Sequence, residues 1–218
     1  MQGINNLLAV VILVLLGSPS WAQPVIADGK EWLQPRDFRL LSWNDVNAVC
    51  PAGTCTGTLT GTGGSIDVTG YTWATQAEVA ELFNSYGVNP PLTSPFTSSS
   101  SEVNSTWAPA FQEDFQRTDS SRVVGWSSSD TGDVGHYSYI QDRGPDEADL
   151  ASPYNVQPKE NSFITIGVWL YRLPPPPPPA PSAAEPIPTL SVYGLVLTML
   201  GLFTVAARRL SSRKGRKG

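Results

Sequence analysis

The last part of the chain, Ile187 to Gly218, constrains its organisation most. A short motif comes first, an uncharged apolar run from Leu190 to Ala207 follows, and a basic end closes the chain. As a helix the apolar run would span about 27 Å, which is at the short end of what crosses a bilayer. The basic residues that follow it are Arg208, Arg209, Arg213, Lys214, Arg216 and Lys217. Because such clusters stay on the cytoplasmic side, the chain before Ile187 is expected outside the cytoplasm.

The motif that opens this tail carries a resemblance to a known sorting signal. It consists of Ile187, Pro188, Thr189, Leu190 and Ser191, with Tyr193 and Gly194 shortly after. The tail resembles the IPTL-CTERM signal of Gram-negative bacteria, a relative of the PEP-CTERM signal, in which Trp usually stands where this chain has Tyr193. The resemblance implies an exosortase-type membrane protease-transpeptidase as a partner, which removes the tail and passes the protein to the cell surface. A plain C-terminal membrane anchor is the alternative, because it needs the same apolar length and positive flank.

The first residues, 1–22, have the pattern of a secretory signal peptide. An apolar run from Leu7 to Leu16 is followed by small residues at Ser20 and Ala22, which fit a cleavage site before Gln23. An uncleaved N-terminal anchor is the alternative, but the run is short for a membrane span.

Charge is divided sharply between the exported part and the tail. Of 14 Lys and Arg residues six lie after Ala207, whereas all 19 Asp and Glu residues lie between Asp28 and Glu185. The part before the tail is therefore strongly acidic. An acidic body disfavours nucleic acid and anionic membrane surfaces as partners.

Residues 23–173 have the length of one domain with a single core. Six prolines, Pro174 to Pro179, begin a Pro-rich linker that extends over 174–186. Such a segment favours polyproline II, which rises about 3.1 Å per residue, and we therefore interpret it as a stalk of up to ~40 Å.

Cys50 and Cys55 are the only cysteines, and in an exported protein this pair favours a disulfide that closes a tight loop. A metal site would need more ligands, and His136 is the only histidine, so no metal or other cofactor is expected.

Two short helices are predicted from capping boxes. Ser42 and Asp45 form the first box, and Thr75 and Glu78 form the second. After the second box, Val79, Leu82, Phe83 and Tyr86 repeat at helical spacing. Gly87 then provides a left-handed stop.

Strands are predicted at 122–127, 136–142 and 163–172. In the last of these both faces are apolar, so we expect a central strand covered on both sides. The segment 56–70 is expected to hold loops and a short strand. Together these elements predict an α+β domain of mainly antiparallel strands.

A second resemblance covers most of 31–172. The segments WLQPRDFRLLSWNDVNAVC, GYTWATQAEVAELFNSYG, RVVGWSSS and GVWLYR are similar, in this order, to segments of exported proteins that bear such C-terminal signals. A weaker similarity is to domains of the C-type-lectin or formylglycine-enzyme kind. Neither resemblance implies a ligand.

No motif for catalysis was found. A Ser-His-Asp arrangement would have to use His136, but the chain contains no G-x-S-x-G nucleophile elbow. A lone histidine beside two tyrosines is usually structural. Acidic pairs such as Glu113 with Asp114, or Asp146 with Glu147, could act in a hydrolase, but acidic clusters in loops are usually solvated. Calcium ligation, by Asp130 and Asp133 with Gly132 or by Asp142 with Asp146, is a further alternative without a recognised spacing.

The ligand hypothesis at this point concerns Trp107, Glu113 and Asp114. Trp107 lies in a stretch expected to be irregular, where a sugar could stack on it and bond to the two carboxylates. The alternative is that Trp107 holds its loop to the core. We therefore expect a non-catalytic surface or matrix protein that binds extracellular polysaccharide, with an exported carboxylate-dependent hydrolase as the second hypothesis.

Overall fold

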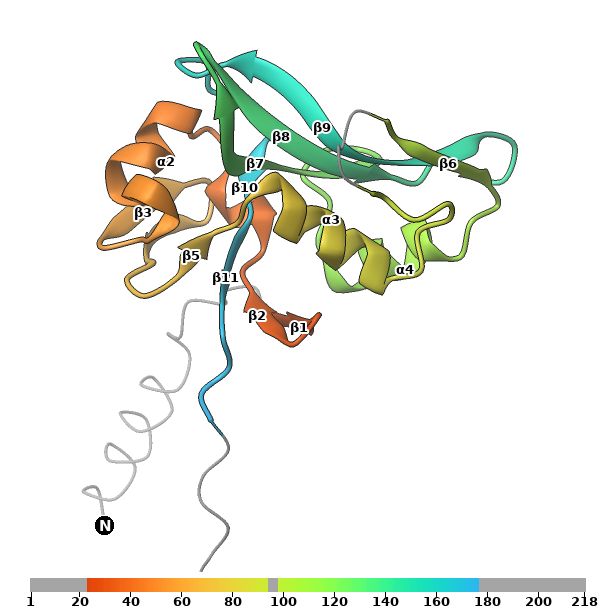
Figure 1. Ribbon diagram of the computed structural model, residues 1–218, viewed down its shortest axis with the longest axis horizontal. Helices are drawn as coiled ribbons and strands as arrows, with labels where there is room; N and C mark the ends of the chain where they lie inside the picture. The colour runs from red at the N-terminus through yellow and green to blue at the C-terminus, as the bar shows by residue number, and fades with distance from the viewer. Residues whose placement is uncertain (1–22, 94–97, 177–218) are drawn as a thin grey trace, which may run out of the picture. The chain divides into compact units, whose positions relative to one another are not determined.

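The computed structural model describes residues 23–93 and 98–176, which form an α+β domain of mainly antiparallel strands (Figure 1). This confirms the expected fold class. The chain divides after Pro174 into two units. The predicted signal peptide, most of the linker and the whole sorting tail lie outside the described residues. Among the described helices none is long and apolar enough to cross a membrane, and the predicted span 190–207 is not among them.

Two sheets and a hairpin make up the strands. The five-stranded sheet has the order β10 (Gly167–Val168), β7 (Arg122–Thr131), β8 (Val134–Gln141), β9 (Ala148–Pro158) and β6 (Ser100–Val103). The four-stranded sheet has the order β1 (Val25–Ala27), β2 (Lys30–Trp32), β11 (Leu170–Arg172) and β5 (Thr72–Trp73). The hairpin pairs β3 (Thr58–Gly61) with β4 (Gly64–Asp67), where the sequence had indicated a single short strand.

Both predicted capping boxes are present. Helix α2 (Trp43–Val49) begins after Ser42, whose side chain accepts from the Asp45 backbone N–H while its own N–H donates to the Asp45 carboxylate. Helix α3 (Gln76–Ser85) begins in the same way at Thr75 with Glu78. Gly87 has a φ of 85°, as the predicted stop requires. Reciprocal capping of this kind satisfies two orphan donors at each helix start.

A third helix, α4 (Trp107–Asp114), occupies the stretch that was expected to be irregular, so that expectation was wrong. Ser105 explains the difference: its hydroxyl accepts from the Ala108 N–H at 3.2 Å and donates to Asp149 on β9 at 2.7 Å. The start of α4 is thus fixed by a strand distant in sequence. Pro109 is tolerated because it lies in the first turn, where its missing N–H has no helical partner to lose.

Strand β7 separates two parts of the core. Val123 belongs to the cluster under α3 and α4, whereas Val124 and Trp126 belong to the cluster that contains Phe38 and Trp43. Figure 1 shows α3 and α4 along one side of the large sheet, and α2 with the β3–β4 hairpin at one end. A strand with buried residues on both faces is the most protected position in such a sheet.

The prediction of one central strand over 163–172 was wrong. Only β10 and β11 are strands, and they belong to different sheets: β10 lies parallel to β7, and β11 pairs antiparallel with β2 and β5. Ile164, expected to face the core, is 62% exposed. Trp169 is the point where the chain changes sheet, because its N–H donates to Trp126 O and its carbonyl accepts from Ala74 N–H.

A 3-10 turn, η1 (Pro35–Phe38), is held against β10 through Gly167. A Cβ on Gly167 would lie 1.8 Å from the Pro35 carbonyl oxygen, so only glycine permits this backbone contact. A second short turn, η2 (Pro51–Gly53), lies in the loop that the Cys50–Cys55 disulfide closes. The predicted disulfide is therefore formed.

Gly167→Ala should destabilise the domain by about 3 kcal/mol or more, because β10 and η1 must separate to admit the methyl group. Gly57→Ala is the matched control, since its added Cβ would meet its nearest neighbour at an ordinary 3.6 Å. The measurement is the urea midpoint of each variant. Equal midpoints for the two variants would contradict the close contact.

Candidate functional site

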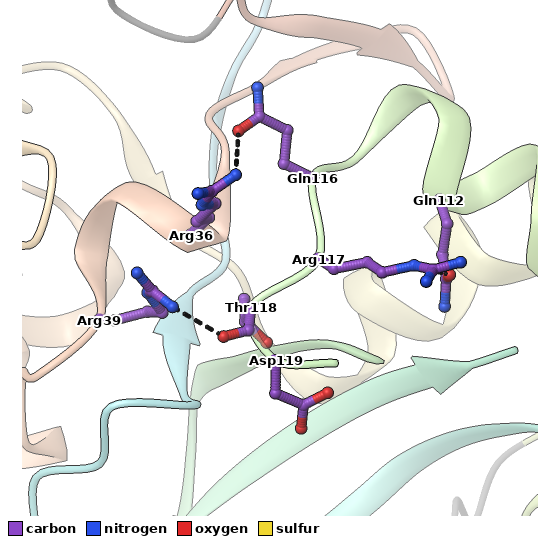
Figure 2. A pocket seen from close by; sticks show the side chains of 7 residues that line it. All are labelled: Arg36, Arg39, Gln112, Gln116, Arg117, Thr118 and Asp119. Atoms are coloured by element: carbon purple, nitrogen blue, oxygen red, sulfur yellow. Dashed lines mark hydrogen bonds between the residues drawn. The ribbon is translucent and has the colours of Figure 1, made fainter. Parts of the chain in front are cut away.

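A cleft of about 550 Å³ lies between η1 and the segment that follows α4 (Figure 2). Its lining combines three arginines with two glutamines, a threonine and one aspartate. These residues are Arg36, Arg39, Gln112, Gln116, Arg117, Thr118 and Asp119. We call it the arginine cleft.

The first wall of the arginine cleft is η1 and the residue after it. Pro35 starts the turn with its φ already set, and buried Phe38 anchors it in the core. The tip of the β3–β4 hairpin rests on the outer side of the turn, where a Cβ on Gly61 would lie 2.5 Å from the Asp37 carbonyl oxygen. Because η1 is held between this hairpin and Gly167, Arg36 and Arg39 extend from a fixed backbone.

The second wall begins in α4 and continues along 115–119. Buried Phe115 stacks on Phe111 and secures the end of the helix. Gln34, 4% exposed, joins the two walls: its Nε2 donates to Asp114 O at 2.9 Å, and its Oε1 accepts from Gln116 N–H at 2.8 Å. The spacing of the walls is therefore set by a buried amide.

The arginines reach across the arginine cleft toward the second wall, as Figure 2 shows. Arg36 Nη1 donates to Gln116 Oε1 at 3.2 Å, and Arg39 Nη1 donates to Thr118 O at 2.9 Å. On the second wall Arg117 donates to Gln112 and pairs with Asp142 at 3.4 Å. Asp119, the one acidic residue of the lining, is paired with Arg122 at 2.6 Å.

Ion pairing distinguishes Arg36 and Arg39 from the other basic residues that the structure describes. Each of the other six lies in an ion pair with at least one carboxylate: Lys30, Arg117, Arg122, Arg143, Lys159 and Arg172. Arg36 and Arg39 have no such pair within the described ranges, and both line the arginine cleft. This concentrates uncompensated positive charge at one place on an acidic domain.

Asp37, in η1, is an acidic residue that interacts with both arginines. Burial raises the pKa of Asp37 above its usual value, and the charges of Arg36 and Arg39 partly oppose that rise. Asp37 thus lies close enough to both guanidinium groups for their charges to affect its ionisation, although it forms no ion pair with either.

The ligand residues suggested by the sequence do not gather on an open surface. Trp107 is 2% exposed, and its Nε1 donates to Glu102 at 2.8 Å, so its ring is part of the core. This is the alternative in which Trp107 holds its segment to the domain, and it overturns the stacking role. Glu113 is exposed, while Asp114 accepts from the Tyr86 hydroxyl at 2.7 Å. Burial, followed by this hydrogen bond, raises the pKa of Tyr86.

The other candidate groups have structural partners. Asp130 pairs with Lys159, and Asp142 pairs with Arg117. Among the residues described, no group of three or more His, Cys, Asp or Glu could hold a metal ion. His136 lies in β8, 5% exposed, with Nε2 3.0 Å from the Thr131 hydroxyl and its ring edge-on to Tyr154.

Arg36 and Arg39 were missed by the reasoning from sequence. The available signal was two arginines three residues apart just after Gln34-Pro35, within an otherwise acidic body. Whether an arginine has a carboxylate partner depends on tertiary contacts, which the sequence alone does not reveal.

Gln34→Met should destabilise the protein by about 1–3 kcal/mol, because a similar volume remains while three backbone groups, those of Gln23, Asp114 and Gln116, lose their partner. Gln157→Met is the control, since in the described structure the Gln157 side chain makes no hydrogen bond. Chemical denaturation checks both. Equal loss in the two variants would show that Gln34 does not join the walls.

Stability should fall between pH 7 and pH 5 in part because of His136. Burial lowers the pKa of His136 below 6.5, with a further lowering by Lys159 and an opposing effect of Asp130. The Nδ1 atom is also buried without a hydrogen-bond partner in the described structure. The unfolded chain therefore binds the proton first, and stability is lost as the pH falls through 6.5 toward the folded pKa. Urea midpoints at both pH values should differ less in His136→Phe, and an unchanged difference would contradict the assignment.

Comparisons with known proteins give no further guide. No protein-family model, curated protein or solved structure matches the chain. Its function is therefore argued from the arginine cleft and the sequence.

Proposed function

We propose that this chain is an exported, non-catalytic cell-surface or matrix protein that binds extracellular polysaccharide through the arginine cleft. In this proposal, the signal peptide directs export and the tail 187–218 is handled by an exosortase-type sorting enzyme. The support for delivery is the motif Ile187 to Ser191, the apolar run 190–207 and the basic end 208–218. The support for binding is the lining of the arginine cleft.

The observation that carries the proposal is the chemistry of that lining. Guanidinium and carboxamide groups donate several hydrogen bonds in fixed directions, which suits recognition of hydroxyl and acidic groups on a sugar chain. General acid–base catalysis requires a group that exchanges protons near neutral pH. Asp119 is poorly suited to this, because its two oxygens accept from the Arg122 side chain and from the N–H groups of Ser121 and Arg122.

The construction of the domain also suits display outside the cell. The Cys50–Cys55 disulfide closes the loop after α2, and oxidising compartments preserve such bonds. Fully buried Trp32, Trp73, Trp126 and Trp169 give the domain a large aromatic core for its size. A stable domain that presents a preformed cleft needs no further moving part to act as a binding protein.

The hydrolase hypothesis has less support from the described carboxylates. Glu31 accepts from Arg172 at 2.6 Å and from the Tyr71 hydroxyl at 3.2 Å. Asp149 accepts from Ser105 and from the Arg143 N–H. These buried carboxylates serve as structural acceptors, which leaves little capacity for attack on a substrate.

Protein extracted from the surface of the producing cells tests the proposal. Its mass should correspond to a chain without Arg208–Gly218, and it should sediment with exopolysaccharide from the same cells without shortening the polymer. Full recovery of Arg208–Gly218 peptides would contradict processing by a sorting enzyme and would favour a plain C-terminal membrane anchor. New reducing ends would favour the hydrolase.

A further inference from the structure

Arg36 and Arg39 bring two positive charges to one cleft, and neither forms an ion pair with a carboxylate of the described residues. Arg36 lies in the turn η1, and Arg39 is the residue that follows it, with an extended backbone. Both line the same cleft, and like charges brought close together repel each other. The described domain contains many carboxylates, yet none of them pairs with either arginine. A bound anionic group would remove the repulsion and supply the missing partner.

Both side chains are held in place before any ligand arrives. Thr62, at the tip of the β3–β4 hairpin, donates to Arg36 O at 2.8 Å and accepts from Arg39 Nε at 3.4 Å. Arg39 also donates to Thr118 O, and Arg36 donates to Gln116. These bonds use only part of each guanidinium, so further N–H groups remain for a ligand. Preorganisation of this kind lowers the entropic cost of binding.

The lining also indicates what kind of anion fits. A planar guanidinium matches a planar carboxylate through two parallel hydrogen bonds. Gln112 and Gln116 add groups that can bond to sugar hydroxyls. The lining contains no aromatic side chain, so ring stacking cannot provide the affinity here. Charge must therefore contribute more than stacking to binding at this place.

The geometry points to a polysaccharide whose sugar units carry carboxylate groups as the ligand of the arginine cleft, with Arg36 and Arg39 as the residues that bind those groups. This inference rests on the proposed function, because it names the class of polymer that the cleft selects. Two arginines at a fixed spacing suit a polymer that repeats its acidic group, since neighbouring units can then engage both.

The test compares two polymers with the same backbone. The processed surface protein is titrated with polygalacturonate and with its fully methyl-esterified form, which has lost the carboxylate charge. Polygalacturonate should bind about tenfold more tightly at low salt, and the difference should shrink as salt is added. Arg36→Gln/Arg39→Gln should remove about the same tenfold.

A matched control keeps the change in net charge equal. Arg143→Gln/Lys159→Gln removes two positive charges that are paired with Glu147 and Asp130, outside the arginine cleft. This variant should bind polygalacturonate as the natural protein does. Melting temperatures of both double variants confirm that each is folded.

Each other outcome overturns a defined part of the argument. Equal binding of the two polymers would overturn this inference, and the proposed function would stand if the protein still sediments with exopolysaccharide from the producing cells. Binding of neither polymer would likewise overturn this inference, whereas failure to sediment with that exopolysaccharide would overturn the proposed function. Tighter binding of dextran sulfate than of polygalacturonate would replace carboxylate by sulfate, and arginine-dependent self-association would assign the cleft to the acidic surface of a second copy.

Discussion

The packing of Trp169 joins the two sheets, and the rest of the domain depends on it. Its ring is fully buried and meets Trp32, Phe83, Phe111 and Phe115 at centroid distances of 5.7–6.4 Å. Its backbone N–H donates to the large sheet at Trp126, and its carbonyl accepts from Ala74, next to β5 of the small sheet. Edge-on contacts of aromatic rings add roughly 0.5–1.5 kcal/mol each beyond the area they bury. Trp169 thus fixes the two sheets, α3 and α4 relative to one another.

The passage of the chain from one sheet to the other at Trp169 also determines where the arginine cleft lies. The Trp169 indole packs directly against the backbone of β7 at Gly125. A Cβ on Gly125 would lie 2.8 Å from the indole Nε1, so glycine is required there. Two residues before Trp169, Gly167 allows the Pro35 carbonyl to approach β10. The first wall of the cleft is therefore placed by the strand that enters the crossover. The second wall is placed by Phe111 and Phe115, which pack against the same indole.

Features decided within a few residues were predictable, and features decided by distant contacts were not. The capping boxes at Ser42 and Thr75 are local, and both helices begin where the sequence indicates. The start of α4 depends on Asp149 through Ser105, so no local pattern marks it. The apolar run 163–172 predicts burial, and the second half of the segment is buried. Periodicity cannot indicate that β10 and β11 belong to different sheets. Trp107 was assigned to an irregular stretch for the same reason.

The arginine cleft illustrates how local and long-range charge can act in opposite directions. The domain as a whole is acidic, so it repels a polyanion at distances beyond the cleft. That long-range repulsion is screened over about 8 Å at physiological ionic strength. Direct bonds from Arg36 and Arg39 act at contact, where the guanidinium groups meet the acidic groups of the ligand. Added salt screens both the repulsion by the domain and the attraction between the two arginines and a carboxylate. A basic cleft confined within an acidic surface therefore selects between polymers. It favours a polymer that can place its acidic groups directly on the two arginines over a polymer that is attracted only by overall charge.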